Sequence, residues 1–143
     1  MKYLTKLIIL CGVLSAGYVQ AESEAGVSRS AFTSAIENKE PVSELKTISN
    51  NTDKVYFFTE LLGLSGHTIT HRWEYNNKVL AEVAFNIGAD RWRTWSSKSI
   101  LPGWTGIWTV SVLDEGGNVI EQNNFEYVEE GQATSVDGLP VTE

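Results

Sequence analysis

Basic and aromatic side chains are concentrated in one short stretch of this 143-residue chain. The segment from Arg91 to Val110 has the sequence RWRTWSSKSILPGWTGIWTV and contains four of the chain's five tryptophans. Arginine binds carboxylate and phosphate groups through two parallel hydrogen bonds, and an exposed tryptophan stacks on sugar rings, aromatic groups or guanidinium groups. The segment therefore supplies either a ligand-binding platform or a part of the hydrophobic core.

Alternation along a strand divides these aromatic side chains between two faces. In the strand expected from Asp90 to Ser97, Arg91 and Arg93 share one face with Trp95. Two arginines do not both face an apolar core, so Trp95 is predicted to lie outside and Trp92 to point inward. The predicted core aromatics are Trp73, Trp92 and Trp108.

The predicted binding face, called the Arg/Trp face, combines this strand with basic residues that lie near it in the sequence. An alternative from the same residues is that the arginines pair with Glu74, Glu82 and other acids across the sheet, with Trp95 lying under their aliphatic stems. Both interpretations remain open at this point. The candidate ligand-binding residues are Arg72, Arg91, Arg93, Trp95 and Lys98.

Other kinds of site have little support in the sequence. His67 and His71 lie four residues apart, and on a strand that spacing separates them by roughly 13 Å, too far to share one metal ion. The Gly63–His67 segment (GLSGH) has the wrong spacing for a nucleophile elbow, and no glycine-rich phosphate loop is present. We therefore predict no metal, no cofactor and no catalytic residue, with His71 a hydrogen-bonded core histidine.

The N-terminus has the pattern of a secretory signal peptide. Lys2 and Lys6 precede an apolar run, and small residues lead to a cleavage site after Ala21. Removing residues 1–21 takes away the single cysteine and two of the eleven basic residues, leaving nine bases against eighteen acids. A net charge of −9 argues against nucleic acid or an anionic membrane as partner. The predicted location is periplasmic or secreted, with no membrane span after cleavage.

Short alternating segments separated by turn residues indicate an all-β domain. About seven strands at even spacing favour a single antiparallel β-sandwich of the immunoglobulin-like kind over residues 28–128. The polar segment 37–53 is expected to form a helical turn or a loop. Residues 22–27 are predicted to be flexible, and the acidic tail 129–143 to be disordered.

Several blocks of this sequence resemble a known family. They are FTSAIENKEPVSEL, VYFFTELLGLSGHTITHRWEYNNKVLAEVAF, RWRTWSSK and GWTGIWTVSVLDEGGNVI, and together they reach from Val27 to about Val128. They resemble the uncharacterised bacterial family catalogued as domain of unknown function 2914. The resemblance implies a β-rich extracytoplasmic domain and no activity that can be transferred. The last hairpin, GIWTVSVLDEGGN, is also similar to bacterial immunoglobulin-like modules.

These observations favour a non-catalytic extracytoplasmic binding module. Its Arg/Trp face would bind an anionic saccharide, a peptide or an envelope protein. One alternative is a small hydrolase or lyase that acts on envelope polymers. Another is a structural subunit that pairs with its partner through an exposed edge strand.

Overall fold

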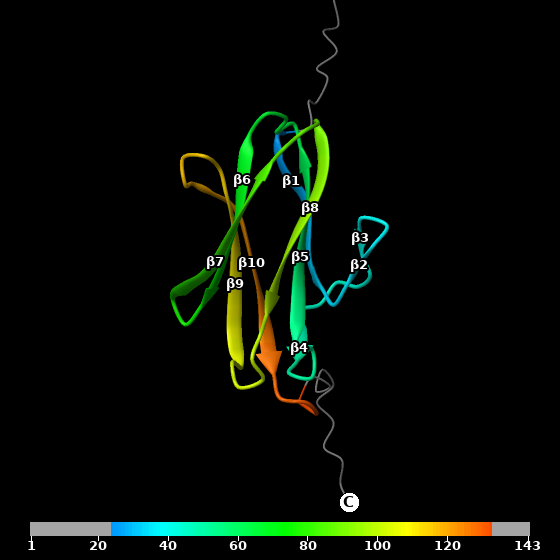
Figure 1. Ribbon diagram of the computed structural model, residues 1–143, viewed down its shortest axis with the longest axis vertical. Helices are drawn as coiled ribbons and strands as arrows, with labels where there is room; N and C mark the ends of the chain where they lie inside the picture. The colour runs from blue at the N-terminus through cyan, green and yellow to red at the C-terminus, as the bar shows by residue number, and fades with distance from the viewer. Residues whose placement is uncertain (1–23, 133–143) are drawn as a thin grey trace, which may run out of the picture.

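Two β-sheets pack face to face in the computed structural model, which describes residues 24–132 (Figure 1). The described residues contain no helix, so the prediction of an all-β sandwich is confirmed. It follows that they also contain no helix long and apolar enough to cross a membrane. The predicted signal peptide and most of the predicted tail lie outside the described residues.

The smaller sheet has three antiparallel strands in the order β1-β5-β8. Strand β5 lies in the middle because its sequence, KVYFFTELL, is apolar or aromatic on both faces and is buried along most of its length. The bounds are β1 (Gly26–Thr33), β5 (Lys54–Leu62) and β8 (Arg91–Ser99).

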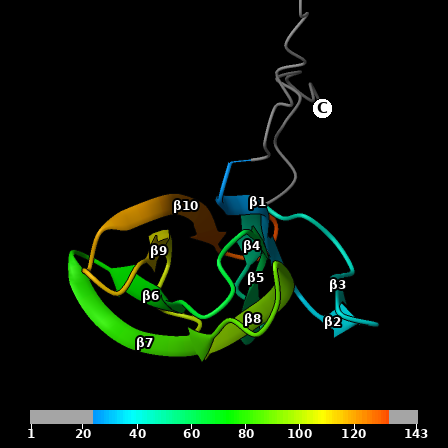
Figure 2. The same ribbon diagram turned by 90° about the horizontal axis from the view of Figure 1, so that it is seen from above.

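The larger sheet has five strands in the order β4-β10-β9-β6-β7. All its pairs are antiparallel except β4 with β10, so the predicted antiparallel sandwich contains one parallel pair. A two-stranded hairpin, β2–β3, projects from the outer side of the smaller sheet (Figure 2). The remaining bounds are β2 (Ile36–Glu37), β3 (Glu40–Pro41), β4 (Thr47–Ser49), β6 (Thr68–Tyr75), β7 (Lys78–Asn86), β9 (Gly106–Leu113) and β10 (Val119–Val128).

The segment 37–53 differs from its prediction as a helical turn or a loop, because it contributes to β2, β3 and β4. Strands of two or three residues are too short to show alternation, and this is why the sequence pattern missed them. The hairpin turn at Asn38 and Lys39 has positive φ at both residues, 51° and 61°, like the turn at Asn76 and Asn77. Lysine is not a typical residue for that conformation, so the turn carried no sequence signal.

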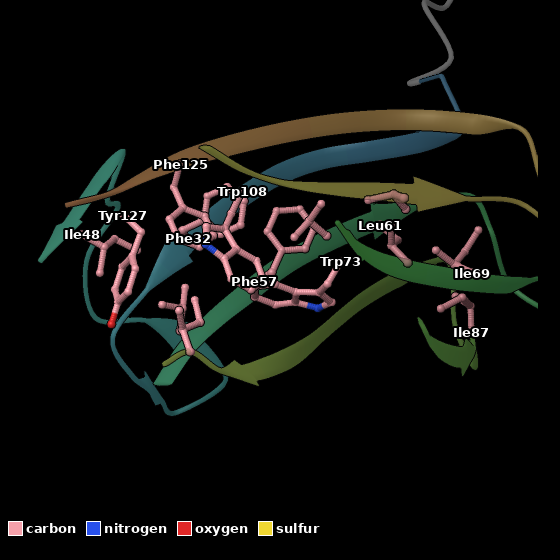
Figure 3. Packing of buried hydrophobic residues seen from close by; sticks show 14 residues of the cluster. Phe32, Ile48, Phe57, Leu61, Ile69, Trp73, Ile87, Trp108, Phe125 and Tyr127 are labelled. Atoms are coloured by element: carbon pink, nitrogen blue, oxygen red, sulfur yellow. The ribbon is translucent and has the colours of Figure 1, made fainter. Parts of the chain in front are cut away.

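The core between the sheets is built on large aromatic side chains (Figure 3). Trp73 and Trp108 are fully buried, so these two predictions are confirmed. Trp108 stacks on Tyr75 with ring centroids 4.6 Å apart, and Phe32 joins the sheets by contacting both Phe57 and Phe125. Since the mature domain is predicted to lack a disulfide, burial of these rings is its main source of stability.

A chain of neutral hydrogen bonds crosses this core and ties the two sheets together. Trp73 Nε1 donates to Ser96 Oγ at 3.0 Å, and Ser96 Oγ lies 2.8 Å from His71 Nδ1. His71 Nε2 lies 3.1 Å from Thr59 Oγ1, which donates to the Thr94 carbonyl. All donors are satisfied when Nδ1 accepts from Ser96 and the Nε2 hydrogen is donated to Thr59.

His71 is therefore the hydrogen-bonded core histidine that the sequence predicted. Its ring also meets the edges or faces of Phe57 and Phe85, each at a centroid distance of 4.9 Å. Burial lowers the pKa of His71 to about 3, so the ring is neutral at physiological pH. A histidine in this state serves packing and inter-sheet alignment.

Candidate ligand-binding face

The outer face of the smaller sheet carries a cluster of arginines from two strands. Arg91 and Arg93 project outward from β8, since Thr94 and Ser96 on the opposite face of that strand are buried. Arg29 joins them from β1, because strand pairing places both Arg29 and Arg93 opposite the same residue of β5, Glu60. The arginine cluster consists of Arg29, Arg91 and Arg93 with the carboxylates of Glu40 and Glu60.

Glu60 pairs with two arginines of this cluster, Arg91 and Arg29. Its Oε2 accepts hydrogen bonds from Arg91 Nε at 3.2 Å and from Arg91 Nη2 at 2.9 Å, and it lies 3.6 Å from Arg29 Nη1. The carboxylate is only 7% exposed, and Ser28 Oγ donates to its other oxygen. Burial opposes ionisation, but the hydrogen bonds from Arg91 and Ser28 outweigh it and lower the pKa of Glu60. Glu60 is therefore a fixed negative centre under the guanidinium groups.

Glu40 bridges two arginines from the tip of the β2–β3 hairpin. Its oxygens lie 2.8 Å from Arg29 Nη2 and 2.6 Å from Arg93 Nη1. Hydrogen bonds from Arg29 and then Arg93 are the main causes that lower the pKa of Glu40 to about 2. The hairpin is held against the sheet by this bridge and by its base, where Thr33 Oγ1 contacts Ser43 and the Ala35 carbonyl.

Trp95 lies on the predicted outer face, beside Phe58 of β5 in the strand register. It is half-buried, and Phe58 is fully buried although it also points outward. Arg29 lies over the Phe58 ring at 5.3 Å, so aliphatic and guanidinium groups cover the apolar surface here. The charged row of Arg29, Glu60 and Arg93 therefore lies next to the aromatic row of Phe58 and Trp95 on the same sheet face.

The prediction that Trp92 belongs to the core is wrong. Its side chain is 37% exposed and packs on Gly88, where an added Cβ would come within 3.0 Å of the indole ring. Trp92 does share a strand face with the buried Thr94 and Ser96, as predicted. It is exposed because it lies at the start of an edge strand, where only β5 flanks it.

Two other residues predicted for the Arg/Trp face lie elsewhere. Arg72 is on the outer face of the larger sheet, where its Nε donates to Glu82 at 2.6 Å. Lys98 points toward the inner side at the end of β8, with Nζ 5.8 Å from the Trp104 ring centroid. The predicted site is therefore divided among three places, and only Arg91, Arg93 and Trp95 remain together.

The sequence prediction did not include Arg29, Glu40 and Glu60. Alternation in β1 places Arg29 on an outer face, but strand pairing with β5 was needed to bring it near Arg93. Of metal sites, residues 24–132 contain no group of three or more His, Cys, Asp or Glu side chains that could hold an ion. The two histidines have separate partners, since His67 contacts Glu115 on the surface at 3.0 Å while His71 lies in the core.

Comparison with known protein families gives a match over part of the chain. Residues 66–127 match the family described as protein of unknown function (DUF2914). The chain resembles this family. The DUF2914 match is shorter than the resemblance expected from the sequence, and it covers β6 to β10 with Arg91, Arg93 and Trp95 but without Arg29, Glu40 and Glu60. No curated protein matches this sequence.

Proposed function

We propose that this protein is a non-catalytic extracytoplasmic binding module that recognises an anionic partner through the arginine cluster and Trp95. The observation that carries the proposal is the charge balance of the cluster. Three guanidinium groups share two carboxylates, in a chain that otherwise has an excess of acids. The cluster itself therefore has a net charge of +1 on an acidic protein.

Arg91 is the group best placed to meet a ligand. Its side chain is 67% exposed, and both its hydrogen bonds to Glu60 leave from one side of the guanidinium group. The remaining N–H groups can pair with a second carboxylate or a phosphate, because guanidinium carries five donors. Trp95 and the aliphatic stems beside it would contact an apolar or sugar surface next to that anion.

The ligand class that fits is an anionic group presented by a saccharide, a peptide or an envelope protein. The state of His71 supports a binding role over the hydrolase or lyase alternative. The ring is held inside the core between Ser96 and Thr59, and it has no carboxylate partner there. A neutral, enclosed histidine is a poor general acid or base for an outside substrate.

We further propose that the sandwich is of the immunoglobulin-like kind. In such domains the first, second and fifth strands share one sheet, and the third, sixth and seventh share the other. Here β1, β5 and β8 correspond to the first group, and β6, β9 and β10 to the second, with β7 added next to β6. The buried Trp73 on β6 occupies the strand on which those domains carry their core tryptophan.

Binding of the purified protein to immobilised polygalacturonate, with neutral dextran as the uncharged control, tests the proposed site. We expect retention on polygalacturonate that falls with salt and is lost in Arg91→Ala. Arg72→Ala is the matched control, since it removes an equal charge from the other sheet and should bind as wild type does. Equal loss in both variants, or no retention of the wild type, would contradict the site.

Export is tested separately by intact-mass measurement of protein from the periplasmic fraction. The expected species begins at Glu22, as the residues before the predicted cleavage site require. A soluble cytoplasmic species that retains Met1 would contradict the proposed location.

A further inference from the structure

A groove lies along the side of the sandwich between β1 and β10. These two strands lie near each other when the molecule is seen from above (Figure 2). Its volume is about 780 Å³, and residues from the edges of both sheets line it. None of the five residues of the arginine cluster lines the groove, so it is separate from the proposed anion site. One end of the groove is at Thr47 of β4, and β4 pairs only with the last three residues of β10, Glu126 to Val128.

The β10 wall of the groove presents unpaired backbone groups. Glu126 N–H donates to the Lys46 carbonyl at 2.9 Å, and the Val128 carbonyl accepts from Asn50 N–H at 2.7 Å. Backbone groups alternate in direction along a strand, so those of Gln122 and Asn124 point to the same side. No described strand pairs with them there. The chain runs along β5 as β1 and reaches the edge of β10 only at Lys46, just before β4.

The β1 wall faces the groove in the same way. The Phe32 carbonyl accepts from Leu45 N–H at 2.8 Å and therefore points away from β5. By the same alternation, the N–H and C=O of Ser30 point into the groove. The side chain of Asn123 donates to Ser30 Oγ at 2.8 Å and joins the two walls. The groove thus has open sheet edges on both sides.

We infer that this groove accepts an extended polypeptide segment of a partner protein, which adds to β10 as a strand in line with β4. The argument is continuity, since β4 already pairs with this edge in parallel and the groove continues its path. Six of the twelve lining side chains are hydroxyl, amide or small, and the backbone edges that they flank are available for main-chain recognition. Glu44 and Glu126 outnumber Lys46 among the charged lining residues, which favours a neutral or basic segment.

Hydrogen exchange on the whole protein tests this inference with a defined probe. The probe is a short synthetic peptide of alternating threonine and valine with a lysine at each end, used at millimolar concentration. We expect exchange of the Gln122 and Asn124 amides to slow by about tenfold or more when the peptide is present. The amides of Glu82 and Ala84 are the internal control, since they point to the open edge of β7 and should not change.

Variants of the protein and of the peptide sharpen the test. Asn124→Pro removes an N–H that faces the groove without removing a bond to β9, so it should abolish the slowing at Gln122, whereas Ala84→Pro should leave it intact. The same peptide with N-methyl groups at alternate residues should be inactive, and this arm does not depend on the variants folding. Arg91→Ala should respond as wild type, which separates this groove from the proposed anion site.

Three results would overturn the inference. The first is unchanged exchange at Gln122 and Asn124 with the peptide present. The second is equal slowing at the β7 edge, which would indicate general adhesion to any open strand. The third is slowing that appears without peptide as protein concentration rises, which would make a second copy of this chain the occupant.

Discussion

Two polar clusters lie on opposite faces of the smaller sheet, β1-β5-β8, and they differ in charge and in exposure to water. The inner cluster of Thr59, His71, Trp73 and Ser96 is neutral, enclosed and fully hydrogen-bonded. The outer cluster of Arg29, Arg91, Arg93, Glu40 and Glu60 is charged, and most of it is reached by water. Burial of a charge is costly, whereas exposed charges exchange partners at little cost. The inner cluster is therefore suited to fixing the fold, and the outer one to exchanging partners.

The largest expected effect distinguishes Trp73, a member of the inner cluster, from the exposed Trp92. Trp73→Ala removes a fully buried ring and leaves Ser96 without its donor, so it should lower the free energy of unfolding by about 3–5 kcal/mol. Trp92→Ala removes a partly exposed ring and should cost about 1 kcal/mol or less. Denaturant unfolding of both variants measures the difference. Equal losses would show that Trp92 is a core residue after all.

The inner cluster should also make stability depend on pH. The pKa of His71 falls from 6.5 to about 3 on folding, so below pH 6.5 the unfolded chain binds a proton that the folded chain does not. Stability should therefore decrease as pH falls, by about 1.4 kcal/mol for each pH unit once well below 6.5. The range from 6.5 to about 5 separates histidine from carboxylate effects, because carboxylates with ordinary unfolded pKa values titrate lower.

Urea unfolding across that range measures the slope. His71→Gln should be less stable at neutral pH but should lose most of the slope. His67→Gln is the matched control, since it removes the surface histidine and should keep it. A wild type whose stability is flat from pH 6.5 to about 5 would contradict the neutral inner cluster.

A smaller effect is expected for stability in the outer cluster. Arg91→Ala should change the free energy of unfolding by about 1 kcal/mol or less, because Arg29 and Ser28 still contact Glu60. The same variant should lose binding to an anionic ligand. Thermal melts and the binding assay, both done on Arg91→Ala and on wild type, test this. A large loss of stability would mean that the cluster stabilises the fold instead of binding a ligand.

The smallest expected effect is that of a chelator. The outer cluster is held by arginine–glutamate pairs, so EDTA should leave the melting temperature unchanged. A decrease of several degrees would mean that a bound metal contributes to stability.

Sequence patterns predicted the long strands well, because alternation in segments such as Thr68–Tyr75 and Gly106–Leu113 extends over a whole strand. They predicted the candidate site only in part. Alternation distinguishes inside from outside but cannot tell the outer face of one sheet from that of the other, and this is why the sequence prediction groups Arg72 with Arg91. It also cannot show where an edge strand loses its cover, as at Trp92.

A bulge limited the prediction in a further place. Val79 would point inward if alternation continued through β7, but the register shifts between Ala81 and Val79, with Leu80 as the extra residue. Val79 is consequently exposed. Such a shift follows from how two strands meet, and the sequence of one strand does not contain it.

The parallel pairing of β4 with β10 has a mechanical consequence. The chain passes from β1 through the β2–β3 hairpin into β4, and β10 is its last strand. Tension between the two ends of the described chain therefore pulls β4 and β10 in opposite directions along their length. Bonds that lie across such a pull share the load and break together, whereas bonds in a hairpin pulled at its open end break one after another. We expect the sandwich to resist stretching until this short patch gives way, in a single abrupt event.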